Sequence, residues 1–260
     1  MICHSYGSPN GRPMADNVNL GNEILLSIVI PAHNEERRLG PSLDKIFEFL
    51  SKQDYQAEVV VVENGSSDKT LQIAQQAAGA HGNLKVIAES RRGKGLAVRI
   101  GMLAARGEYR FLCDADLSMP IDQVNKFLPP ELAEAEVAIA SREAPGAVIY
   151  DEPYHRRMIG RWFNRLTRLI LLPGLQDTQC GFKCFRSDIA EAIFTRQVID
   201  GMAFDAEVLY IARRMGHRIV EVPIPWYFDP DSRVRLFHDS GKMAFDLLAI
   251  RRNGKRGVYD

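Results

Sequence analysis

The chain has 260 residues, of which 46% are hydrophobic and 25% are charged. This length suits one large domain with a substantial buried core, and the composition is that of an ordinary globular protein. Lysines and arginines together number 33, as do aspartates and glutamates, so the formal net charge is zero. A neutral chain favours neither a nucleic-acid binder nor a protein with an acidic tail.

No apolar run reaches the roughly 18–20 residues that span a bilayer, and the first residues lack the charged start and apolar stretch of a secretory signal. Residues 1–22 are rich in Gly, Pro, Asn and Ser, which predicts a flexible tail. The cysteines do not have the spacing of a zinc or redox site, so we expect reduced thiols in a cytoplasmic protein. They are Cys3, Cys113, Cys180 and Cys184.

Short β-branched runs alternate with helical patterns from residue 26 onwards. The runs predict buried strands at residues 26–30, 58–62, 84–88, 109–113 and 137–140. The segments between them predict helices at residues 39–50, 68–80 and 96–105. Such alternation is typical of an α/β domain with a mostly parallel sheet and helices on both faces. We place this domain at residues 23–230, followed by a helical, basic segment at residues 231–260.

Three polar segments directly follow predicted strands. They are residues 31–36, 63–68 and 114–116. Ligands of open α/β sheets bind beyond the carboxyl ends of the strands. We therefore expect the three segments to converge on one edge of the sheet.

Asp114 and Asp116 are the strongest candidates for a metal site. Two carboxylates this close repel each other unless a cation or hydrogen bonds compensate them. Their hard oxygen atoms suit Mg²⁺ or Mn²⁺, which also bind diphosphate oxygens. Aspartates are also common in turns, so a simple turn pair is the alternative. The position after a buried strand, beside two other polar loops, favours the metal site.

Two further loops predict contacts with a nucleotide. Residues 63–68 combine a turn with helix-capping side chains, and Glu63 could accept hydrogen bonds from a base or ribose. Residues 91–95 place glycines and basic side chains before a helix, which suits a phosphate group. Plain helix capping is the alternative for the first loop, and a solvated basic turn is the alternative for the second.

The segment at residues 156–172 is a basic amphipathic pattern. Met158, Trp162 and Leu169 belong to its apolar side, and arginines are interspersed mainly on the other side. Such a helix is typical of a membrane surface, although a core-facing helix with a solvated basic side fits the same pattern. The basic cluster at residues 251–256 is either a solvated tail or a contact for anionic lipid headgroups.

Residues 177–183, Asp-Thr-Gln-Cys-Gly-Phe-Lys, are dense in hydrogen-bonding groups. This density suits a pocket for a sugar or an acceptor, and a bare turn is the alternative. The first strand with residues 31–36, the turn at 63–68 and the Asp114–Asp116 motif resemble family 2 glycosyltransferases of the GT-A fold, a Rossmann-like α/β architecture.

Three more segments narrow this resemblance to one group within the family. Residues 92–99, 177–183 and 203–212 resemble dolichyl-phosphate β-glucosyltransferases and their polyprenyl-phosphate relatives, including dolichol-phosphate mannose synthases. The match covers roughly residues 25 to 250. The first-strand and aspartate motifs are shared across the whole family, whereas the string at 177–183 is much more specific.

The resemblance implies roles for individual residues. It implies a nucleotide-sugar site formed by Pro31, Ala32, Asn34, Glu35, Glu63, Asn64, Lys94, Asp114 and Ala115. It implies that Asp116 is the main ligand of Mg²⁺ or Mn²⁺, with Asp114 facing the metal or the sugar. It places Asp177 at the junction of sugar and acceptor. It places an acceptor or donor phosphate, most simply the acceptor phosphate, at Arg142, Arg156 and Arg157. Asp116, Asp177 and Arg142 are the expected catalytic residues.

The sequence also departs from the family pattern. Glu63 and Asn64 stand where many relatives have an acidic pair, which leaves the preferred base open. Ser118 stands where mannose synthases have a glutamine that helps to bind metal. The chain also lacks the C-terminal transmembrane pair of some relatives, so any membrane attachment is expected to be peripheral.

The resemblance implies an inverting glycosyltransferase that moves a hexose from a nucleotide diphosphate sugar to a polyprenyl or dolichyl phosphate. The resemblance favours UDP-glucose as donor, and it implies peripheral contact with the cytoplasmic face of a membrane and no nucleic-acid partner. A glycosyltransferase with a soluble acceptor is an alternative. A nucleotide-sugar-binding membrane adaptor without turnover is another. A nucleotidyltransferase is disfavoured, because no glycine-rich basic loop follows the first strand.

Overall fold

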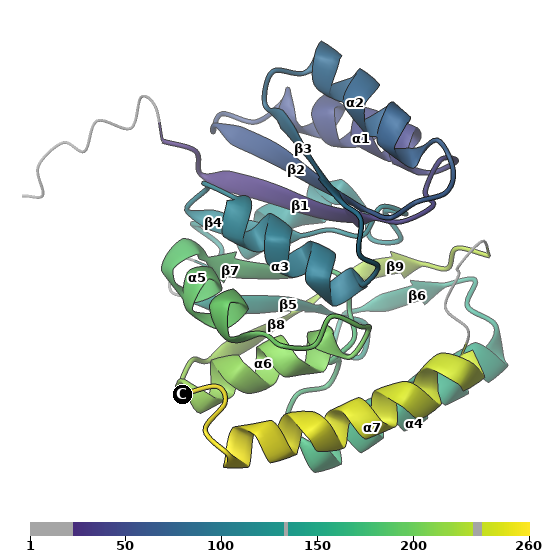
Figure 1. The fold of residues 1–260 in the computed structure, drawn as a ribbon, viewed down its shortest axis with the longest axis vertical. Coiled ribbons are helices and arrows are strands. Elements are labelled where there is room, and N and C mark those ends of the chain that lie inside the picture. The colour runs from purple at the N-terminus through teal and green to yellow at the C-terminus, as the bar shows by residue number, and fades with distance from the viewer. Residues whose placement is uncertain (1–22, 133–134, 231–235) are drawn as a thin grey trace, which may run out of the picture.

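The computed structural model describes residues 23–132, 135–230 and 236–260, with the backbone alone for residues 236–242 (Figure 1). The predicted flexible tail at residues 1–22 lies outside these ranges, as do the first residues of the predicted C-terminal segment. The described residues form an α/β fold with two small additions, a second sheet and a pair of long helices.

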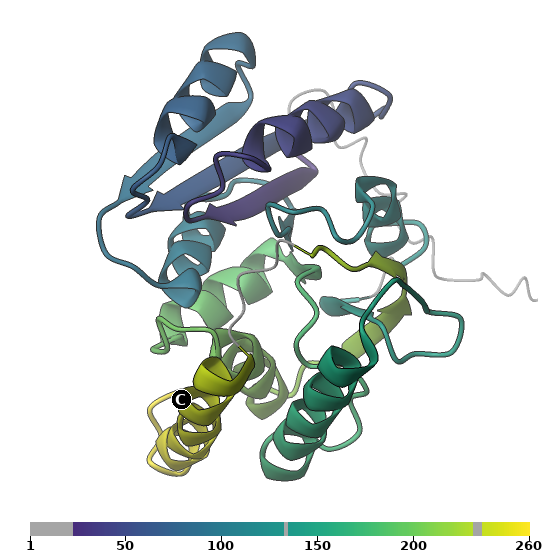
Figure 2. The ribbon, with the colours of Figure 1, turned by 90° about the vertical axis from the view of Figure 1, so that its right-hand side faces the viewer.

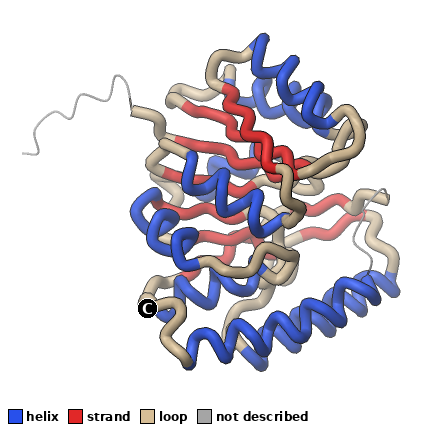
Figure 3. The backbone as a smooth tube through the Cα atoms, in the orientation of Figure 1, coloured by secondary structure: helices blue, strands red, loops and turns tan. Residues whose placement is uncertain are grey.

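A central sheet, whose strands are red in Figure 3, has the strand order β3-β2-β1-β4-β7-β5-β8 within the described part of the chain. β7 runs antiparallel to both of its neighbours, whereas the other strand pairs are parallel. The predicted mostly parallel sheet is thereby confirmed. The strands are β1 (Leu26–Ala32), β2 (Ala57–Asn64), β3 (Leu84–Glu89), β4 (Tyr109–Leu112), β5 (Val137–Ser141), β7 (Lys183–Arg186) and β8 (Ile219–Pro223).

Successive side chains along each strand point to opposite faces of the sheet, so they contribute to two apolar layers. Val59 and Val61 of β2 join the layer that includes residues of α1 (Leu39–Leu50), α2 (Thr70–Ala80) and the 3-10 helix η1 (Ile121–Phe127). Val60 and Val62 face the opposite layer, which α3 (Lys94–Ala104), α5 (Ser187–Arg196) and α6 (Phe204–Arg214) cover (Figure 1). Helices therefore cover both faces, as the strand–helix alternation predicts.

The strand register brings the three polar segments to one edge. Ala32 at the end of β1 pairs with Glu63 near the end of β2. Leu112, the last residue of β4, pairs with Val29 of β1. Two residues further on, Asp114 therefore reaches the level of Pro31, close to the ends of β1 and β2.

A second, smaller sheet and two long helices adjoin this edge. β6 (Val148–Tyr150) pairs in parallel with β9 (Pro225–Tyr227), and the rings of Tyr150 and Tyr227 stack. The helices α4 (Tyr154–Ile170) and α7 (Leu236–Lys255) contact each other and lie at the same end of the molecule (Figure 2). Leu247 and Ile250 of α7 join the core layer of α6. Among the described residues, no helix has the length and apolar character required to cross a membrane.

Candidate active site

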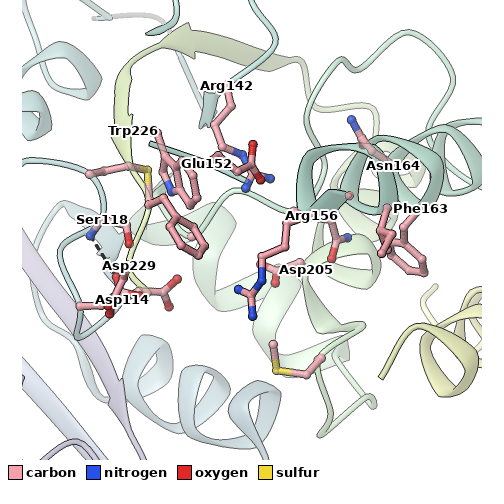
Figure 4. Close-up of a pocket in the computed structure, with 18 of the residues that line it drawn as sticks. Asp114, Ser118, Arg142, Glu152, Arg156, Phe163, Asn164, Asp205, Trp226 and Asp229 are labelled. Atoms are coloured by element: carbon pink, nitrogen blue, oxygen red, sulfur yellow. Dashed lines mark hydrogen bonds between the residues drawn. The ribbon is translucent and has the colours of Figure 1, made fainter. Parts of the chain in front are cut away.

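A cavity of about 260 Å³ opens between the carboxyl end of β4, α4 and the segment that follows β9 (Figure 4). Charged side chains from distant parts of the chain line it: Lys94, Asp114, Asp116, Arg142, Glu152, Arg156, Asp205 and Asp229. Its uncharged lining includes Ser118, Phe163, Asn164, Gln179, Trp226 and Phe228. The structure thus brings together the predicted metal site and two of the three predicted acceptor arginines.

Asp114 and Asp116 have different electrostatic surroundings. The Lys94 ammonium lies 2.6 Å from Asp114 Oδ1 and, although burial acts in the other direction, the pKa of Asp114 is lowered. Burial raises the pKa of Asp116, and the negative charge of Asp114 raises it further. Asp116 accepts one backbone hydrogen bond, from Ser118 at 3.0 Å, and its Oδ2 lies 3.9 Å from Arg38 Nη1. An added cation next to Asp116 would relieve this repulsion.

The surrounding charges leave the site acidic. Arg38 forms a two-pronged ion pair with Glu35, with both distances 2.7 Å, and also contacts Asp229 from the far end of the chain. Lys183 is fully buried and donates to Asp205 and to the carbonyl of Cys180. The group comprises Arg38, Lys94 and Lys183 with Glu35, Asp114, Asp116, Asp205 and Asp229. Three cations therefore face five carboxylates, which gives a formal charge of −2.

This donor set fits a divalent cation held by few protein ligands. Within the described ranges, no cluster of three or more His, Cys, Asp or Glu is arranged to hold a metal ion. Mg²⁺ in nucleotide sites usually keeps several waters and is bound by one or two carboxylates together with phosphate oxygens. The Asp114–Asp116 pair at a formally acidic edge has the composition of such a site.

The loop at residues 177–183 packs directly on the aspartate pair. A Cβ atom added to Gly181 would lie 2.7 Å from Asp114 Cγ and closer still to Oδ2. Real Cβ atoms essentially never approach other heavy atoms this closely. The glycine therefore allows the loop to close over Asp114, and this explains one member of the specific string at 177–183.

Asp177 lies beneath the cavity, where it holds Arg142. Its carboxylate accepts hydrogen bonds from Arg142 Nε at 2.7 Å, Nη2 at 3.1 Å and the Arg142 backbone N–H at 3.1 Å. Burial alone would raise the pKa of Asp177, but the Arg142 guanidinium lowers it. Asp177 is 1% exposed and does not line the cavity. The geometry favours a residue that orients Arg142 over one that contacts the sugar.

The three predicted acceptor arginines occupy different positions. Arg142 and Arg156 line the cavity, and each guanidinium lies over an aromatic ring, Arg142 over Trp226 at 5.5 Å and Arg156 over Phe228 at 5.3 Å. Figure 4 shows the Arg156 side chain extending from α4 into the cavity. Arg157 does not line it. A role for Arg157 in binding the acceptor phosphate stays a prediction, and its place outside the cavity lining does not add support to it.

The predicted nucleotide residues at and beyond the ends of β1 and β2 mostly link neighbouring loops at this edge. Asn34, at a φ of +57°, accepts a hydrogen bond from the Ser67 N–H at 2.8 Å. Glu63 accepts one from the Ser66 N–H at 2.5 Å, and Asn64 donates to the Gly93 carbonyl at 3.0 Å. None of them lines the cavity, and the same holds for Pro31, Ala32, Glu35 and Ala115. They lie in or beside the adjoining loops at the carboxyl edge, and their contact with a nucleotide stays a prediction.

Several lining residues carried no predicted role. Asp205 lies within the 203–212 segment that carries part of the resemblance. The sequence therefore drew attention to the segment but did not predict that Asp205 lines the cavity. Glu152, Asn164 and Asp229 come from turns and helix positions that have no local motif. They reach the site only through the long-range fold.

Exposed apolar side chains lie on α4 and α7, the two long helices that each contribute residues to the cavity. Trp162 is 67% exposed, Leu169 is 84% exposed and Phe245 of α7 is 76% exposed. Tyr154, Met158, Leu166 and Leu248 are further exposed apolar residues on these two helices. We call this set the α4–α7 strip. Large exposed apolar patches on globular proteins mark contacts with membranes or partners.

An acidic pair at a strand end, a helix N-terminus with a lysine, and arginines across a cavity define a class of protein. On an open α/β sheet this combination fits a glycosyltransferase of the GT-A fold. The family model for glycosyl transferase family 2 matches residues 27–194. The chain belongs to glycosyl transferase family 2 and is a glycosyltransferase.

Curated relatives place the chain within one branch of this family. It is 35% identical to a dolichyl-phosphate beta-glucosyltransferase of Drosophila melanogaster, over 86% of this chain and 74% of the relative. The enzymes of that name from Homo sapiens and Saccharomyces cerevisiae are 33% and 34% identical, over 90% and 91% of this chain and 77% of each relative. The expected resemblance is confirmed.

Solved structures agree with the GT-A fold. Glucosyl-3-phosphoglycerate synthase from Mycobacterium tuberculosis in complex with UDP superposes with a TM-score of 0.61, covering 88% of this chain and 79% of that one at 20% identity. The same enzyme with Mn²⁺, UDP-glucose and glycerol 3-phosphate superposes with a TM-score of 0.60, covering 87% and 78% at 20% identity. At this identity the likeness concerns the fold alone.

Proposed function

We propose that the protein transfers glucose from UDP-glucose to dolichyl phosphate or a similar polyprenyl phosphate, with inversion at the anomeric carbon. The observation that carries this proposal is the cavity that joins the Asp114–Asp116 pair to Arg142 and Arg156. One side suits a metal-bound diphosphate and the other suits a phosphate acceptor. The names of the curated relatives support the same donor sugar and lipid.

Asp116 is the better placed of the two aspartates for a divalent cation. The Lys94 ammonium already occupies Asp114 Oδ1, so a cation there would compete with an existing ion pair. Mg²⁺ or Mn²⁺ bound at Asp116 supplies Lewis acidity and neutralises charge on the departing diphosphate. The mycobacterial synthase was solved in complex with Mn²⁺ and UDP-glucose, so this fold can accommodate that metal and donor.

Lys94 adds a second positive group on the diphosphate side. It lies in the first turn of α3, where the helix dipole favours negative charge. Burial tends to lower the pKa of Lys94, but the carboxylates of Asp114 and Asp205 outweigh it and raise the pKa above its ordinary value. The side chain therefore stays charged at neutral pH.

Arg142 and Arg156 are suited to hold the acceptor phosphate. Arg142 Nε and Nη2 donate to Asp177, which leaves Nη1 outside this ion pair and fixes the plane of the guanidinium. Guanidinium groups bind phosphate through parallel hydrogen bonds. A phosphate monoester is largely ionised at pH 7, because its second pKa is about 6. Its oxygen can bond C1 as the bond from C1 to UDP breaks, without a strong general base.

The Asp177→Asn variant tests how Arg142 is held. We expect the KM for the lipid phosphate to rise about tenfold, because a charge-assisted hydrogen bond contributes roughly 1.5–3 kcal/mol. The KM for UDP-glucose should stay unchanged. Asp188→Asn is the matched control, since Asp188 forms the same two-pronged pair with Arg186 on the surface.

Steady-state kinetics with each substrate varied in turn provide the measurement. Because removing one partner of a buried ion pair can cost several kcal/mol of stability, thermal unfolding of both variants is recorded alongside. Arg142→Lys keeps the positive charge but loses the two-pronged guanidinium, and it should raise the KM for the lipid phosphate by a similar factor. An effect on UDP-glucose alone would contradict the assignment.

The α4–α7 strip supports peripheral contact with a membrane. Arg161 and Arg165 are exposed on the same helix as Trp162 and Leu169, and basic side chains attract anionic headgroups. The cavity includes Phe163 and Met243 from these two helices. A lipid phosphate whose chain stays in the bilayer could therefore reach Arg156 from the side of the strip.

Replacing Trp162 and Leu169 together with glutamate should weaken binding to anionic liposomes at least about a hundredfold, because burying each large apolar side chain contributes roughly 1.5–3 kcal/mol. Co-sedimentation over a range of lipid concentrations measures the partition coefficient. Leu103→Glu is the control, since Leu103 is 37% exposed but lies on α3. Equal binding by the double variant and the wild-type protein would show that the strip does not contact the membrane.

A donor panel tests the proposed function itself. Purified protein is incubated with Mg²⁺ or Mn²⁺, a short polyprenyl phosphate in liposomes, and UDP-glucose, UDP-N-acetylglucosamine or GDP-mannose in separate reactions. Glucosyl lipid from UDP-glucose is the expected product. Transfer from GDP-mannose alone would overturn the donor assignment while leaving the lipid acceptor standing.

A further inference from the structure

The first turn of α3, which carries Lys94, rests on the segment at residues 197–202 between α5 and α6. A Cβ added to Gly95 would lie 2.7 Å from Phe204 Cβ and 2.9 Å from the Gly201 carbonyl oxygen. Gln197 donates to the Gly95 carbonyl at 2.9 Å, and the Leu96 N–H donates to the Asp200 carbonyl at 3.2 Å. Backbone meets backbone here, so a shift of this segment moves the turn that positions Lys94.

Glu207 of α6 holds the segment from below. Its carboxylate is fully buried and accepts hydrogen bonds from the Ile199 N–H at 2.8 Å and the Val198 N–H at 3.2 Å. The remaining partner is the hydroxyl of Tyr259, which donates to Oε1 at 2.7 Å. Leaving a buried carboxylate without one of its hydrogen-bond donors costs free energy. The three donors therefore together fix the position of the Glu207 carboxylate, and loss of one weakens the hold on the others.

Tyr259 belongs to the turn that follows α7, and that turn is docked on α6. Its ring is 1% exposed and meets Tyr210 edge-on, with centroids 6.1 Å apart. The Val258 N–H donates to the Asn253 carbonyl at 3.1 Å, which closes the turn. Further along the same helix lie Phe245 of the α4–α7 strip and Met243, which lines the cavity.

We propose that Tyr259 and Glu207 are positioning residues: their buried hydroxyl–carboxylate bond holds the segment at 197–202 against α3, sets Lys94 for the nucleotide diphosphate, and links the seating of α7 to donor binding. The chain of contacts runs from α7 through Tyr259, Glu207 and Ile199 to the turn at Lys94. The role assigned to Lys94 in this inference rests on the proposed function.

Tyr259→Phe tests the link, because it removes one oxygen and keeps the ring. We expect the affinity for UDP in the presence of Mn²⁺ to fall about tenfold, the range for a lost hydrogen bond to a charged group. Calorimetric titration with UDP measures this without transfer, so the result is independent of whether the lipid acceptor is correct. Failure of wild-type protein to glucosylate a lipid would sink the proposed function instead.

A double-mutant cycle separates positioning from general loss of stability. If Tyr259 acts through Lys94, Tyr259→Phe should have little effect on UDP affinity in a Lys94→Met background, because the two changes then share one pathway. Equal effects in both backgrounds would overturn the proposal. So would an unchanged UDP affinity after Tyr259→Phe alone.

Two further variants serve as controls. Tyr210→Phe removes a hydroxyl that lies against Gly254 of α7 but keeps the ring and leaves the bond to Glu207, so UDP affinity should stay within about twofold. Glu207→Gln keeps an acceptor for the backbone N–H groups and a donor for the tyrosine oxygen, and should retain more affinity than Glu207→Ala. Hydrogen exchange gives a second readout: the amides of Val198 and Ile199 should exchange faster in Tyr259→Phe, and unchanged exchange would count against the link.

Discussion

Replacing Asp116 with asparagine is expected to reduce glucose transfer at least about a hundredfold, the scale found when one preorganised electrostatic group is removed from an active site. Asparagine keeps the size of the side chain and the acceptor for the Ser118 N–H, so the fold should persist. The loss should fall mainly on kcat, because the departing diphosphate carries most charge in the transition state.

Asp122→Asn is the matched control for this variant. Asp122 lies six residues further along the chain, in η1, where it is exposed and does not line the cavity. Steady-state transfer with saturating Mn²⁺, together with titration of Mn²⁺ against each protein, provides the measurement. Full activity of Asp116→Asn would rule out Asp116 as the metal ligand.

Gly181→Ala is expected to lower transfer at least about tenfold, although the added group is a single methyl. The new Cβ would overlap the Asp114 carboxylate, so either the loop at 177–183 or Asp114 must move. Overpacking of this kind typically costs about 1–3 kcal/mol of stability. Movement of Asp114 would also disturb its 2.6 Å contact with Lys94, so donor binding should weaken as well.

The control for this substitution is Gly79→Ala on α2, where no atom lies within 4 Å of the added Cβ. Alanine favours a helix over glycine by about 1 kcal/mol, so this variant should gain stability slightly and keep its activity. Thermal unfolding and transfer rates are measured in parallel. If Gly181→Ala unfolds like the wild-type protein and transfers glucose at the same rate, the loop does not constrain Asp114.

Local patterns were sufficient to predict the half of the sheet that carries the proposed metal site. The valine run at 59–62 and the apolar run after Leu26 are buried on both faces, as parallel strands usually are. The carboxyl ends of parallel strands meet at one edge of the sheet. The polar segments at the ends of these strands are therefore expected at that edge. The Asp114–Asp116 motif could therefore be placed without knowledge of distant contacts.

The second half of the fold depends on contacts that no local pattern encodes. β7 carries the ordinary sequence Lys-Cys-Phe-Arg, and nothing in it indicates an antiparallel strand between β4 and β5. The three-residue strands β6 and β9 are shorter than any window in which alternation can be recognised. Arg38 meets Asp229 across 191 positions, a pairing visible only in three dimensions.

At the candidate site, too, the sequence predicted which segments are involved but not what each side chain contacts. The string at 177–183 predicted a pocket, and the loop does close over the aspartate pair through Gly181. The sequence could not reveal that Asp177 is buried outside the cavity lining and holds Arg142. Likewise, polar residues at the ends of β1 and β2 indicated a nucleotide site. In the structure, Asn34 and Asn64 form hydrogen bonds to neighbouring loops, and Glu63 accepts one from the turn that follows it.

The proposed function depends above all on the choice of acceptor, which one competition experiment can decide. Purified protein with Mn²⁺ and radiolabelled UDP-glucose is given a short polyprenyl phosphate in liposomes and 3-phosphoglycerate in solution at equal concentration. We expect label in the lipid fraction, its loss in Asp116→Asn, and none in glucosyl-3-phosphoglycerate. Label in the soluble product alone would show that Arg142 and Arg156 serve a soluble phosphate acceptor and would contradict the proposed function.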